Sequence, residues 1–244
     1  MAGGYRPPYF IEEIMKINVY VDGFNLFYGS LKAKPNPNLS SDMQKKLKQE
    51  KKKLRWLDLN KLVMEFVKGK NIYIQKINFY TADVKPHYTG DKSPLYQQEY
   101  FKALKTLKNI NIIKGRYDLH PKKLPVYPLQ NPLVFQTVLN TEEKRSDVNF
   151  AAHLVYDSCI DDFDMAVLIT NDSDLLEPIK IAKKMGKRFL ILSPHSSINN
   201  DFLINFDISS LRKISSKNIK NSQFPDIVYD ENQNIVAKRP QAWA

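Results

Sequence analysis

The strongest structural signal in this sequence is Met165-Ala166-Val167-Leu168-Ile169, which runs directly into Thr170-Asn171-Asp172-Ser173-Asp174. The first five residues are all apolar, as in a parallel strand that is buried on both faces. The next five are polar and include two carboxylates, as in a turn that leaves the carboxyl end of such a strand. The stretch therefore predicts a covered parallel sheet with acidic groups at its carboxyl edge.

Strand-like and helix-like segments alternate on both sides of this stretch. Further strands are expected at 17–21, 72–80, 110–113 and 188–192, and helices at 57–68, 94–108, 146–158 and 175–185. Such alternation predicts βαβ units and a mostly parallel sheet with helices on both faces, which is an α/β fold class.

Two segments depart from the alternating pattern. Residues 117–140 are rich in proline and are expected to form a small irregular insertion, with an extra strand at 133–139. Residues 219–244 are rich in Asn, Gln and Pro, and we expect a tail that wraps the surface and forms no second domain.

Charge and composition narrow the functional classes. The 37 Lys and Arg residues outnumber the 26 Asp and Glu residues, and the net charge of +11 favours a polyanionic partner, nucleic acid before a membrane surface. The single cysteine, Cys159, and four scattered histidines provide no Cys/His zinc set. The eight glycines form neither G-x-G-x-x-G nor G-x-x-x-x-G-K-[ST], which disfavours Rossmann-type dinucleotide binding and Walker-A ATP binding.

The longest apolar runs have the length of a strand, against the roughly 20 residues that a membrane helix needs. Residues 1–16 contain no continuous apolar segment of the secretory type. We therefore expect no membrane association and a cytoplasmic location.

Four carboxylates follow or precede the predicted strands. Asp22 directly follows the first strand, Asp172 and Asp174 follow the apolar strand, and Asp147 opens the helix that leads into it. If the two strands are neighbours, these carboxylates converge on one patch. Their mutual repulsion would call for a cation, and ligands that are all oxygens suit Mg²⁺ or Mn²⁺. A metal ion held in this way can activate water and stabilise charge on a phosphodiester.

Structural roles for the same residues remain open at this point. Asp147 could cap its helix, and Asp174 could cap the next one, because Asp174-Leu175-Leu176-Glu177 has the spacing of a capping box. Asp22 before Gly23 could form a turn. Asp172 is harder to explain structurally, since Asp174 is already expected to supply the cap.

Three segments together resemble one known family. Val19-Tyr20-Val21-Asp22-Gly23-Phe24-Asn25-Leu26-Phe27-Tyr28-Gly29 resembles the opening motif of the NYN domain, whose LabA-like branch belongs to the PIN-like nucleases. Lys144-Arg145-Ser146-Asp147-Val148-Asn149 resembles its second motif, and residues 167–175 its third. The resemblance covers residues 16–210, and the tail from Ser222 to Trp243 resembles the ending of a bacterial subgroup.

The resemblance implies a PIN-like three-layer α/β/α fold and metal-dependent hydrolysis of phosphodiester bonds, usually in RNA. Asp22, Asp147, Asp172 and Asp174 stand at the positions of the family's acidic cluster. Asn25 stands where the family has an Asn that orients the first Asp or a bound water. Many members carry an Asp where this chain has His153, and that leaves a further metal-supporting carboxylate in doubt.

Basic residues gather in an insertion, residues 42–55, which follows the first strand and therefore leaves the sheet at the same edge as Asp22. A grip on the phosphate backbone is one interpretation, and a solvated helix face or a disordered loop is the other. Lys144 and Arg145 could contact a phosphate or pair with carboxylates. Phe24, Phe27 and Tyr28 could stack bases or pack in the core. The candidate nucleic-acid-binding residues are Lys45, Lys46, Lys48, Lys51, Lys52, Lys53, Arg55, Lys144 and Arg145.

The sequence thus predicts a Mg²⁺- or Mn²⁺-dependent endoribonuclease, with Asp22, Asp147 and Asp172 holding the metal and Asp174 as a further ligand or a supporting carboxylate. The alternative is an RNA-binding or regulatory module with little or no catalysis. An aspartyl phosphotransferase of the haloacid-dehalogenase type is disfavoured, because it needs a second Asp where this chain has Phe24. DNA as the substrate and a homodimer both stay open.

Overall fold

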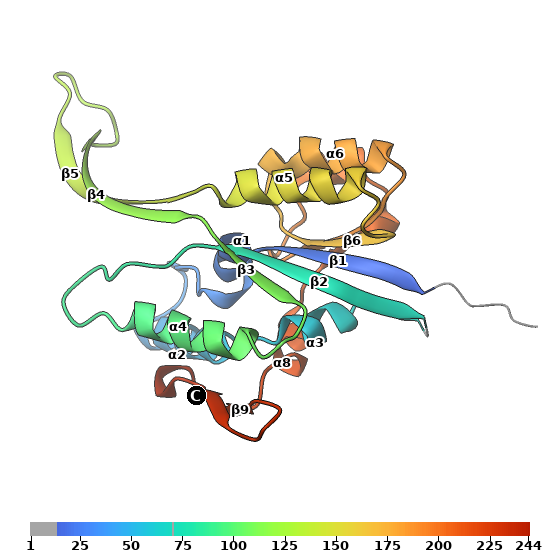
Figure 1. The fold of residues 1–244 in the computed structure, drawn as a ribbon. Coiled ribbons are helices and arrows are strands. Elements are labelled where there is room, and N and C mark those ends of the chain that lie inside the picture. The colour runs from blue at the N-terminus through green and yellow to red at the C-terminus, as the bar shows by residue number, and fades with distance from the viewer. Residues whose placement is uncertain (1–13, 70) are drawn as a thin grey trace, which may run out of the picture.

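The computed structural model describes residues 14–69 and 71–244, and Figure 1 shows the arrangement of their helices and strands. Residues 1–13, which make up most of the stretch where a secretory signal would lie, are outside the described part. The centre is a parallel six-stranded sheet in the order β3-β2-β1-β6-β7-β8. Its strands are β1 (Met15–Asp22), β2 (Ile72–Thr81), β3 (Ile110–Lys114), β6 (Met165–Ile169), β7 (Arg188–Ser193) and β8 (Leu211–Lys213).

Helices cover both faces of the sheet, so the predicted three-layer α/β/α class is confirmed (Figure 1). The helices on one face are α5 (Ser146–Cys159), α6 (Leu176–Lys184) and α7 (Asn200–Asn205), and the short η3 (Ile208–Ser210) follows them. The other face carries α3 (Leu59–Met64), α4 (Ser93–Leu104) and α8 (Ser216–Asn221). Within the described residues, no helix combines the length and the apolar character needed to cross a bilayer.

Strand β1 supplies side chains to both cores in strict alternation. Val19 and Val21 pack with the apolar residues of α3 and α4, whereas Tyr20 packs with Phe150 of α5. All three of these β1 side chains are fully buried. The hydroxyl of Tyr20 donates to Asp157 at 2.6 Å, so its burial leaves no unsatisfied donor. A strand that is buried on both faces explains why residues 17–21 lack the polar alternation of a surface strand.

The strand order reverses between β1 and β6. From β1 the chain builds outward through β2 and β3, and from β6 it builds in the opposite direction through β7 and β8. The register places Val21 beside Ile169, so Asp22 and Thr170 follow at the carboxyl ends of adjacent strands. The prediction that these two strands are neighbours is therefore confirmed, and the reversal is the usual position of a ligand site in an open α/β sheet.

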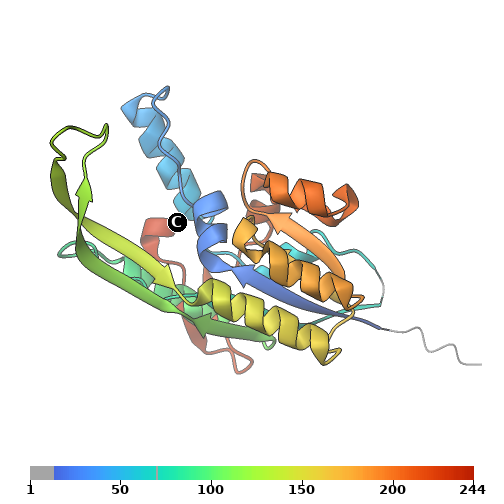
Figure 2. The same cartoon turned by 90° about the horizontal axis from the view of Figure 1, so that it is seen from above.

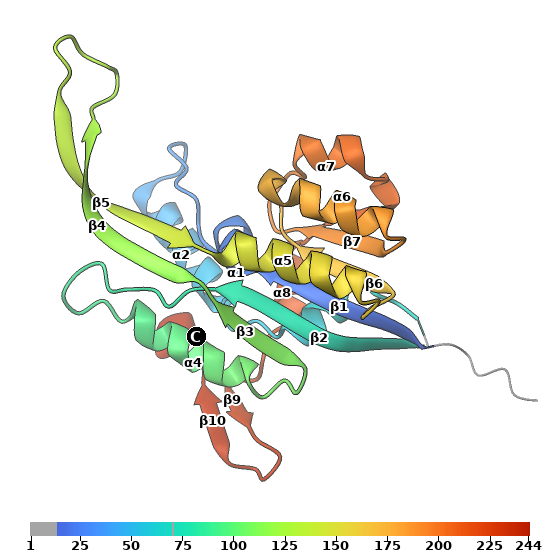
Figure 3. The same ribbon diagram turned by 45° about the horizontal axis from the view of Figure 1, so that its top comes forward.

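The insertion expected to be irregular is a long antiparallel hairpin. It consists of β4 (Arg116–Pro125) and β5 (Phe135–Lys144), and it projects from the body of the molecule in Figures 1, 2 and 3. The extra strand expected at 133–139 lies largely within β5. Residues 117–125, which were also expected to be irregular, form most of β4, whereas residues 126–134 connect the two strands without regular structure. Pro121 fits inside β4 because a two-stranded hairpin has only edge strands, where a missing N–H can face solvent.

The basic insertion is helical. After β1 come the short α1 (Gly23–Leu26) and η1 (Phe27–Leu31), and then α2 (Ser41–Lys53), which the side chain of Ser40 caps. All thirteen residues of α2 are described and none of them is buried. Of the two structural interpretations, the solvated helix is therefore present and the disordered loop is wrong.

The C-terminal segment contributes to the core and does not only wrap the surface. It contains the hairpin β9 (Ile227–Tyr229) and β10 (Ile235–Lys238), followed by η4 (Gln241–Trp243). Trp243 is 7 % exposed and its ring centroid lies 6.4 Å from that of the fully buried Trp56. The sheet itself also continues beyond the predicted domain end at residue 210, because β8 begins at the next residue.

Replacement of Trp243 by alanine should lower the free energy of unfolding by about 2–4 kcal/mol, because it empties a large buried site against Trp56. Tyr229→Ala on the same tail is the matched control. The side chain of Tyr229 is exposed, and its loss should cost less than about 0.5 kcal/mol. Urea denaturation followed by circular dichroism measures both variants. Equal effects of the two substitutions would show that the tail is only loosely attached.

Candidate metal centre

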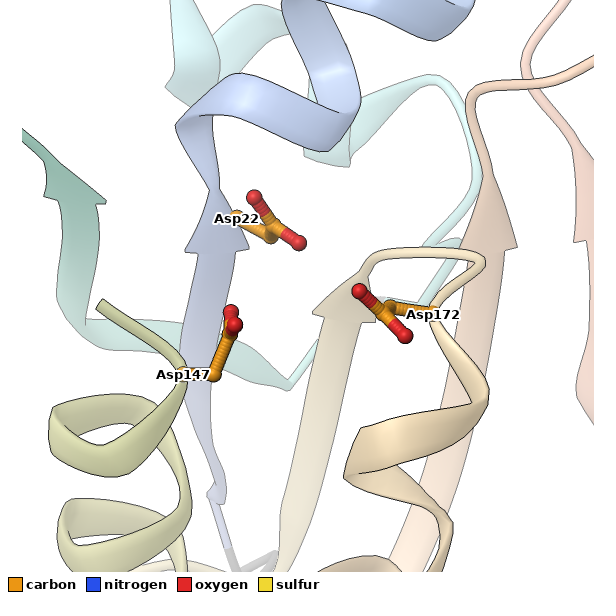
Figure 4. A group of neighbouring side chains, drawn as sticks. All are labelled: Asp22, Asp147 and Asp172. Atoms are coloured by element: carbon orange, nitrogen blue, oxygen red, sulfur yellow. The ribbon is translucent and has the colours of Figure 1, made fainter. Parts of the chain in front are cut away.

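Three carboxylates meet at the point where the strand order reverses. Asp22 ends β1, Asp147 lies in the first turn of α5, and Asp172 lies in the turn after β6. One oxygen of each lies within 4.8 Å of the other two, and Figure 4 shows the three side chains directed into a common space. The folded chain thus gathers three of the four predicted metal ligands from three separate segments.

Asp22 is the most buried of the three, with 6 % of its surface exposed. Its Oδ1 accepts the N–H of Asn25 at 2.9 Å, and its Oδ2 accepts the Thr170 hydroxyl at 3.4 Å. The same Thr170 hydroxyl accepts the N–H of Asp172 at 3.1 Å. Asp22 therefore caps α1 with one oxygen and is tied to the Asp172 turn through Thr170.

Asp172, not Asp174, supplies the helix cap. Its Oδ1 accepts the N–H of Asp174 at 3.0 Å and begins the short helix η2 (Ser173–Leu175), which leads into α6. The expectation that Asp174 caps this helix is therefore wrong, because η2 starts two residues earlier than the capping-box spacing suggests. Asp174 is exposed and lies outside the group of three, although its charge still acts on Asp147.

Asp147 is the least constrained ligand candidate. Its side chain has no hydrogen-bond partner among residues 14–69 and 71–244, so it does not cap α5. The preceding Arg145 has a left-handed backbone, with φ of +80°, at the N-cap position. This conformation is costly for a residue other than glycine and gathers at functional sites. The left-handed turn at Arg145 sets the start of α5, and Asp147 in its first turn faces Asp22 and Asp172 (Figure 4).

Burial and like charges raise the pKa values of Asp22 and Asp147. Burial is the largest cause for Asp22, and the charges of Asp147, Asp172 and Glu143 add to it, so its pKa rises to about 7 although the Asn25 N–H opposes the shift. The pKa of Asp147 is also raised, by burial and then by Asp172, Glu143 and Asp174. A set of hard oxygen ligands under mutual repulsion fits Mg²⁺ or Mn²⁺.

Glu143 is a site residue that the sequence interpretation missed. It lies near the end of β5 and accepts hydrogen bonds from both the N–H and the hydroxyl of Ser146, the N–H at 3.2 Å. Its charge acts on Asp22 and on Asp147. The only sequence signal was its place four residues before Asp147, and the hairpin that returns it to the sheet edge was not foreseen.

Asn25 and His153 are outside the carboxylate group and contact other residues. The Asn25 side chain accepts the N–H of Asn171 at 3.0 Å, so it joins the turn after β1 to the turn after β6. Asn25 contacts Asp22 through its backbone N–H. His153 bonds through Nδ1 to the Tyr80 hydroxyl at 3.2 Å and lies outside the group of three.

The predicted phosphate-binding residues fall into two groups. Lys144 lies 3.2 Å from Glu142 and 4.0 Å from Asp118, so it forms the ion pairs that were the alternative to phosphate binding. Arg145 is exposed beside Asp147. The basic residues of the insertion lie along or just beyond α2, which extends away from the sheet in Figure 2, and they are Lys45, Lys46, Lys48, Lys51, Lys52, Lys53 and Arg55.

The two residues of the insertion nearest the body have structural contacts. Lys51 donates to the carbonyl of Ser30 at 2.8 Å. The guanidinium of Arg55 lies 4.9 Å from the ring centroid of Phe27 and donates to the carbonyl of Leu31 at 3.4 Å. Phe27 is partly buried against the core, which is one of the two roles open to the aromatic residues of the first motif.

Comparison with known proteins identifies no family. No family model matches the chain. The chain is 25 % identical over 260 residues to 6-hydroxy-3-succinoylpyridine 3-monooxygenase HspA of Pseudomonas putida, an alignment that covers 95 % of this chain and 76 % of HspA. A crystal structure of a protein of unknown function from Vibrio parahaemolyticus matches with a TM-score of 0.46 and 11 % identity, over 87 % of this chain and 98 % of that one.

Asp22→Asn should stabilise the metal-free protein at pH 8 by about 2–4 kcal/mol and have little effect at pH 4. The folded-state pKa of Asp22 is raised to about 7, so ionisation of Asp22 lowers stability progressively as the pH rises from about 4 to 7. The asparagine variant avoids this loss while it keeps an acceptor for the Asn25 N–H.

Urea denaturation in EDTA at both pH values measures this difference. Asp207→Asn, at an exposed position without a capping hydrogen bond, is the control and should change stability little at either pH. A variant of Asp22 that is less stable at pH 8 would mean that its hydrogen bonds outweigh the repulsion.

Proposed function

We propose that this protein is a metal-dependent nuclease that hydrolyses phosphodiester bonds, with RNA as the substrate and endonucleolytic cleavage as the mode. The observation that carries the proposal is the group formed by Asp22, Asp147 and Asp172, whose oxygens lie within 4.8 Å of one another at the reversal of strand order. Three carboxylates so close together, one of them buried, are costly unless a cation shares the site.

Asp22, Asp147 and Asp172 would hold the ion. A bound Mg²⁺ or Mn²⁺ supplies a Lewis acid that neutralises charge on a phosphate oxygen and lowers the pKa of a water molecule. Asp22 is held by the Asn25 N–H and the Thr170 hydroxyl, so it offers a fixed oxygen. The Asp147 side chain has no hydrogen-bond partner among the described residues, and the exposed carboxylate of Asp174 acts on it through its charge.

The net charge and the resemblance to the NYN domain both favour RNA as the substrate, the first only in a general way. The net charge of +11 favours a nucleic acid in general. The resemblance of three segments to the NYN domain favours RNA in particular, and it remains a prediction, as do a homodimer and a cytoplasmic location. DNA stays open, because the phosphate chemistry of the two nucleic acids is the same.

The name of the Pseudomonas relative raises oxygenation of an aromatic compound as another possibility. At 25 % identity the relative does not transfer its activity to this chain. The sequence lacks the G-x-G-x-x-G fingerprint of dinucleotide-binding domains. The carboxylate group also contains no histidine, whereas the facial triad of non-haem iron oxygenases contains two. We therefore keep phosphodiester hydrolysis as the proposed function and RNA binding without catalysis as the alternative.

Manganese at a saturating concentration should raise the melting temperature of the wild type by roughly 5 °C, because binding to the folded state alone adds a few kcal/mol of stability. Asp147→Asn should lose most of this shift. Its melting temperature in EDTA should stay equal to or above that of the wild type, since Asp147 has no hydrogen-bond partner in the described residues. Asp207→Asn should respond as the wild type does. An equal shift in all three proteins would place the ion elsewhere.

Cleavage of labelled single-stranded and structured RNA should require Mg²⁺ or Mn²⁺ and stop in EDTA. Asp22→Asn and Asp172→Asn should each lower the rate by on the order of 10²-fold or more, the usual cost of removing one electrostatic contact to a transition state. Asp207→Asn again serves as the control. Salt-sensitive RNA binding without cleavage, unchanged in both variants, would replace the nuclease by the binding module.

A further inference from the structure

A second charged site lies next to the carboxylates. It is a pocket of about 380 Å³ between η1, the loop that precedes α2, α2 itself and the loop that follows β7. Three of its lining residues are lysines, namely Lys32, Lys34 and Lys51, and none of the described lining residues is acidic. The pocket is also lined by Gly29, Leu47 and Ser196 and by residues 33 and 35–37 of the loop before α2.

The three lysines carry charge that the protein does not neutralise. None of them has a carboxylate oxygen within 4.0 Å among residues 14–69 and 71–244. Lys51 is held in place by the Ser30 carbonyl at 2.8 Å, which leaves two of its N–H groups free. The ammonium of Lys32 lies 4.4 Å from the ring centroid of Tyr28. Uncompensated positive charges around a concave surface attract a polyanion.

The loop after β7 lines the pocket through Ser196 and also contacts the turn that carries Asp172. On one side, the N–H of Asn199 donates at 2.9 Å to the side chain of Asn171, which precedes Asp172. On the other side, the Ser30 hydroxyl donates to the carbonyl of Pro194. His195 packs against Gly29 so closely that a Cβ at position 29 would lie 2.8 Å from its ring. The absence of a side chain at Gly29 therefore lets this loop join the two sites.

His195 marks how near the two sites are to each other. The charges of Lys34 and of Asp172 both act on its ring, so this single side chain is within electrostatic reach of the basic pocket and of the acidic group. A ligand that reached from one site to the other would present negative charge to Lys34 and a metal-bound group near Asp172. A nucleic acid strand meets this requirement, because it repeats a phosphate at every nucleotide.

We propose that the pocket lined by Lys32, Lys34 and Lys51 is a second phosphate-binding site, which holds a phosphodiester of the substrate strand other than the one at the carboxylates. The inference rests on the proposed function, because it takes the carboxylate group as the place where the strand is cut.

Aromatic rings beside the pocket favour a single strand over free phosphate. The Tyr28 ring, 43 % exposed, stacks on Phe24 with centroids 6.4 Å apart, and Phe24 stacks on Tyr117 at 6.0 Å. The row begins at Tyr28, whose ring lies under the ammonium of Lys32. Its next member, Phe24, is two residues after Asp22 in the chain. Tyr117 is buried and Phe24 is half-buried, so Tyr28 is the ring of this row that is open to a ligand. An exposed ring next to a lysine favours an unpaired base, because a duplex would keep its bases stacked on one another.

The experiment measures binding of a fluorescent 12-nucleotide single-stranded RNA in EDTA, where cleavage cannot occur, by anisotropy at several salt concentrations. Lys32→Ala/Lys34→Ala should weaken binding about tenfold near 0.1 M salt and reduce the slope of log K against log salt by about one. Lys217→Ala/Lys220→Ala on α8 removes the same charge from two exposed lysines and should change affinity less than twofold. Lys34→Glu alone tests the pocket without disturbing the contact between Lys32 and Tyr28.

Two outcomes overturn the inference. Wild-type affinity in both pocket variants would show that RNA does not use the pocket, and equal weakening in the α8 control would show only a general charge effect. A third arm uses inorganic phosphate in a thermal-shift assay. If phosphate stabilises the wild type but not the pocket variants while RNA affinity is unchanged, the pocket binds the free anion and not a strand.

A cleavage assay separates this inference from the proposed function. Metal-dependent cutting with unaltered RNA binding by the pocket variants would retain the nuclease and remove the pocket. Pocket-dependent RNA binding without any cutting would remove the nuclease, and the pocket would then be a phosphate site of a binding protein.

Discussion

The pairing of β1 with β6 is the constraint on which the other features depend. These strands are adjacent in the sheet although more than a hundred residues separate them in the chain, and the parallel register that sets Val21 beside Ile169 also sets Asp22 beside the Asp172 turn. Burial on both faces fixes the register, because a slip of one residue would turn Tyr20 and Val21 toward the wrong core. The acidic group is thus held together by hydrophobic packing below it, against the repulsion of its own charges.

Backbone donors make this arrangement tolerable. Asp22 and Asp172 each accept the N–H of a following helical turn, and Thr170 links them through its hydroxyl. Asp22 and Asp172 therefore each cap a helix with a side-chain oxygen and also belong to the carboxylate group. A structural role as a cap does not exclude a place in the site. Asp147, which has neither kind of support among the described residues, depends on the backbone turn at Arg145 for its position.

The sequence was sufficient to predict the sheet and the place of the acidic group, because continuous apolar runs such as 165–169 identify buried parallel strands. It did not predict the β4–β5 hairpin, because the prolines Pro121 and Pro125 argue against a strand in the sequence pattern. The strand forms nevertheless, because β4 is an edge strand and an edge strand tolerates proline. Asp172 and Asp174 are only two residues apart, and the sequence does not distinguish which of them caps the helix. Glu143, Lys34 and His195 depend on contacts between distant segments, so no local pattern indicates their proximity to the site.

The two tryptophans of this chain, Trp56 and Trp243, lie together in one aromatic cluster with Tyr96 and Tyr100, on the face of the sheet that α3 and α4 cover. Intrinsic fluorescence excited at the indole band therefore reports on a single place, the docking of the C-terminal turn. The carboxylate edge contains no indole among its described residues and is silent in such a signal. During synthesis, moreover, the cluster stays incomplete until residue 243 has left the ribosome, so this face completes its aromatic packing only after all six strands of the sheet have emerged.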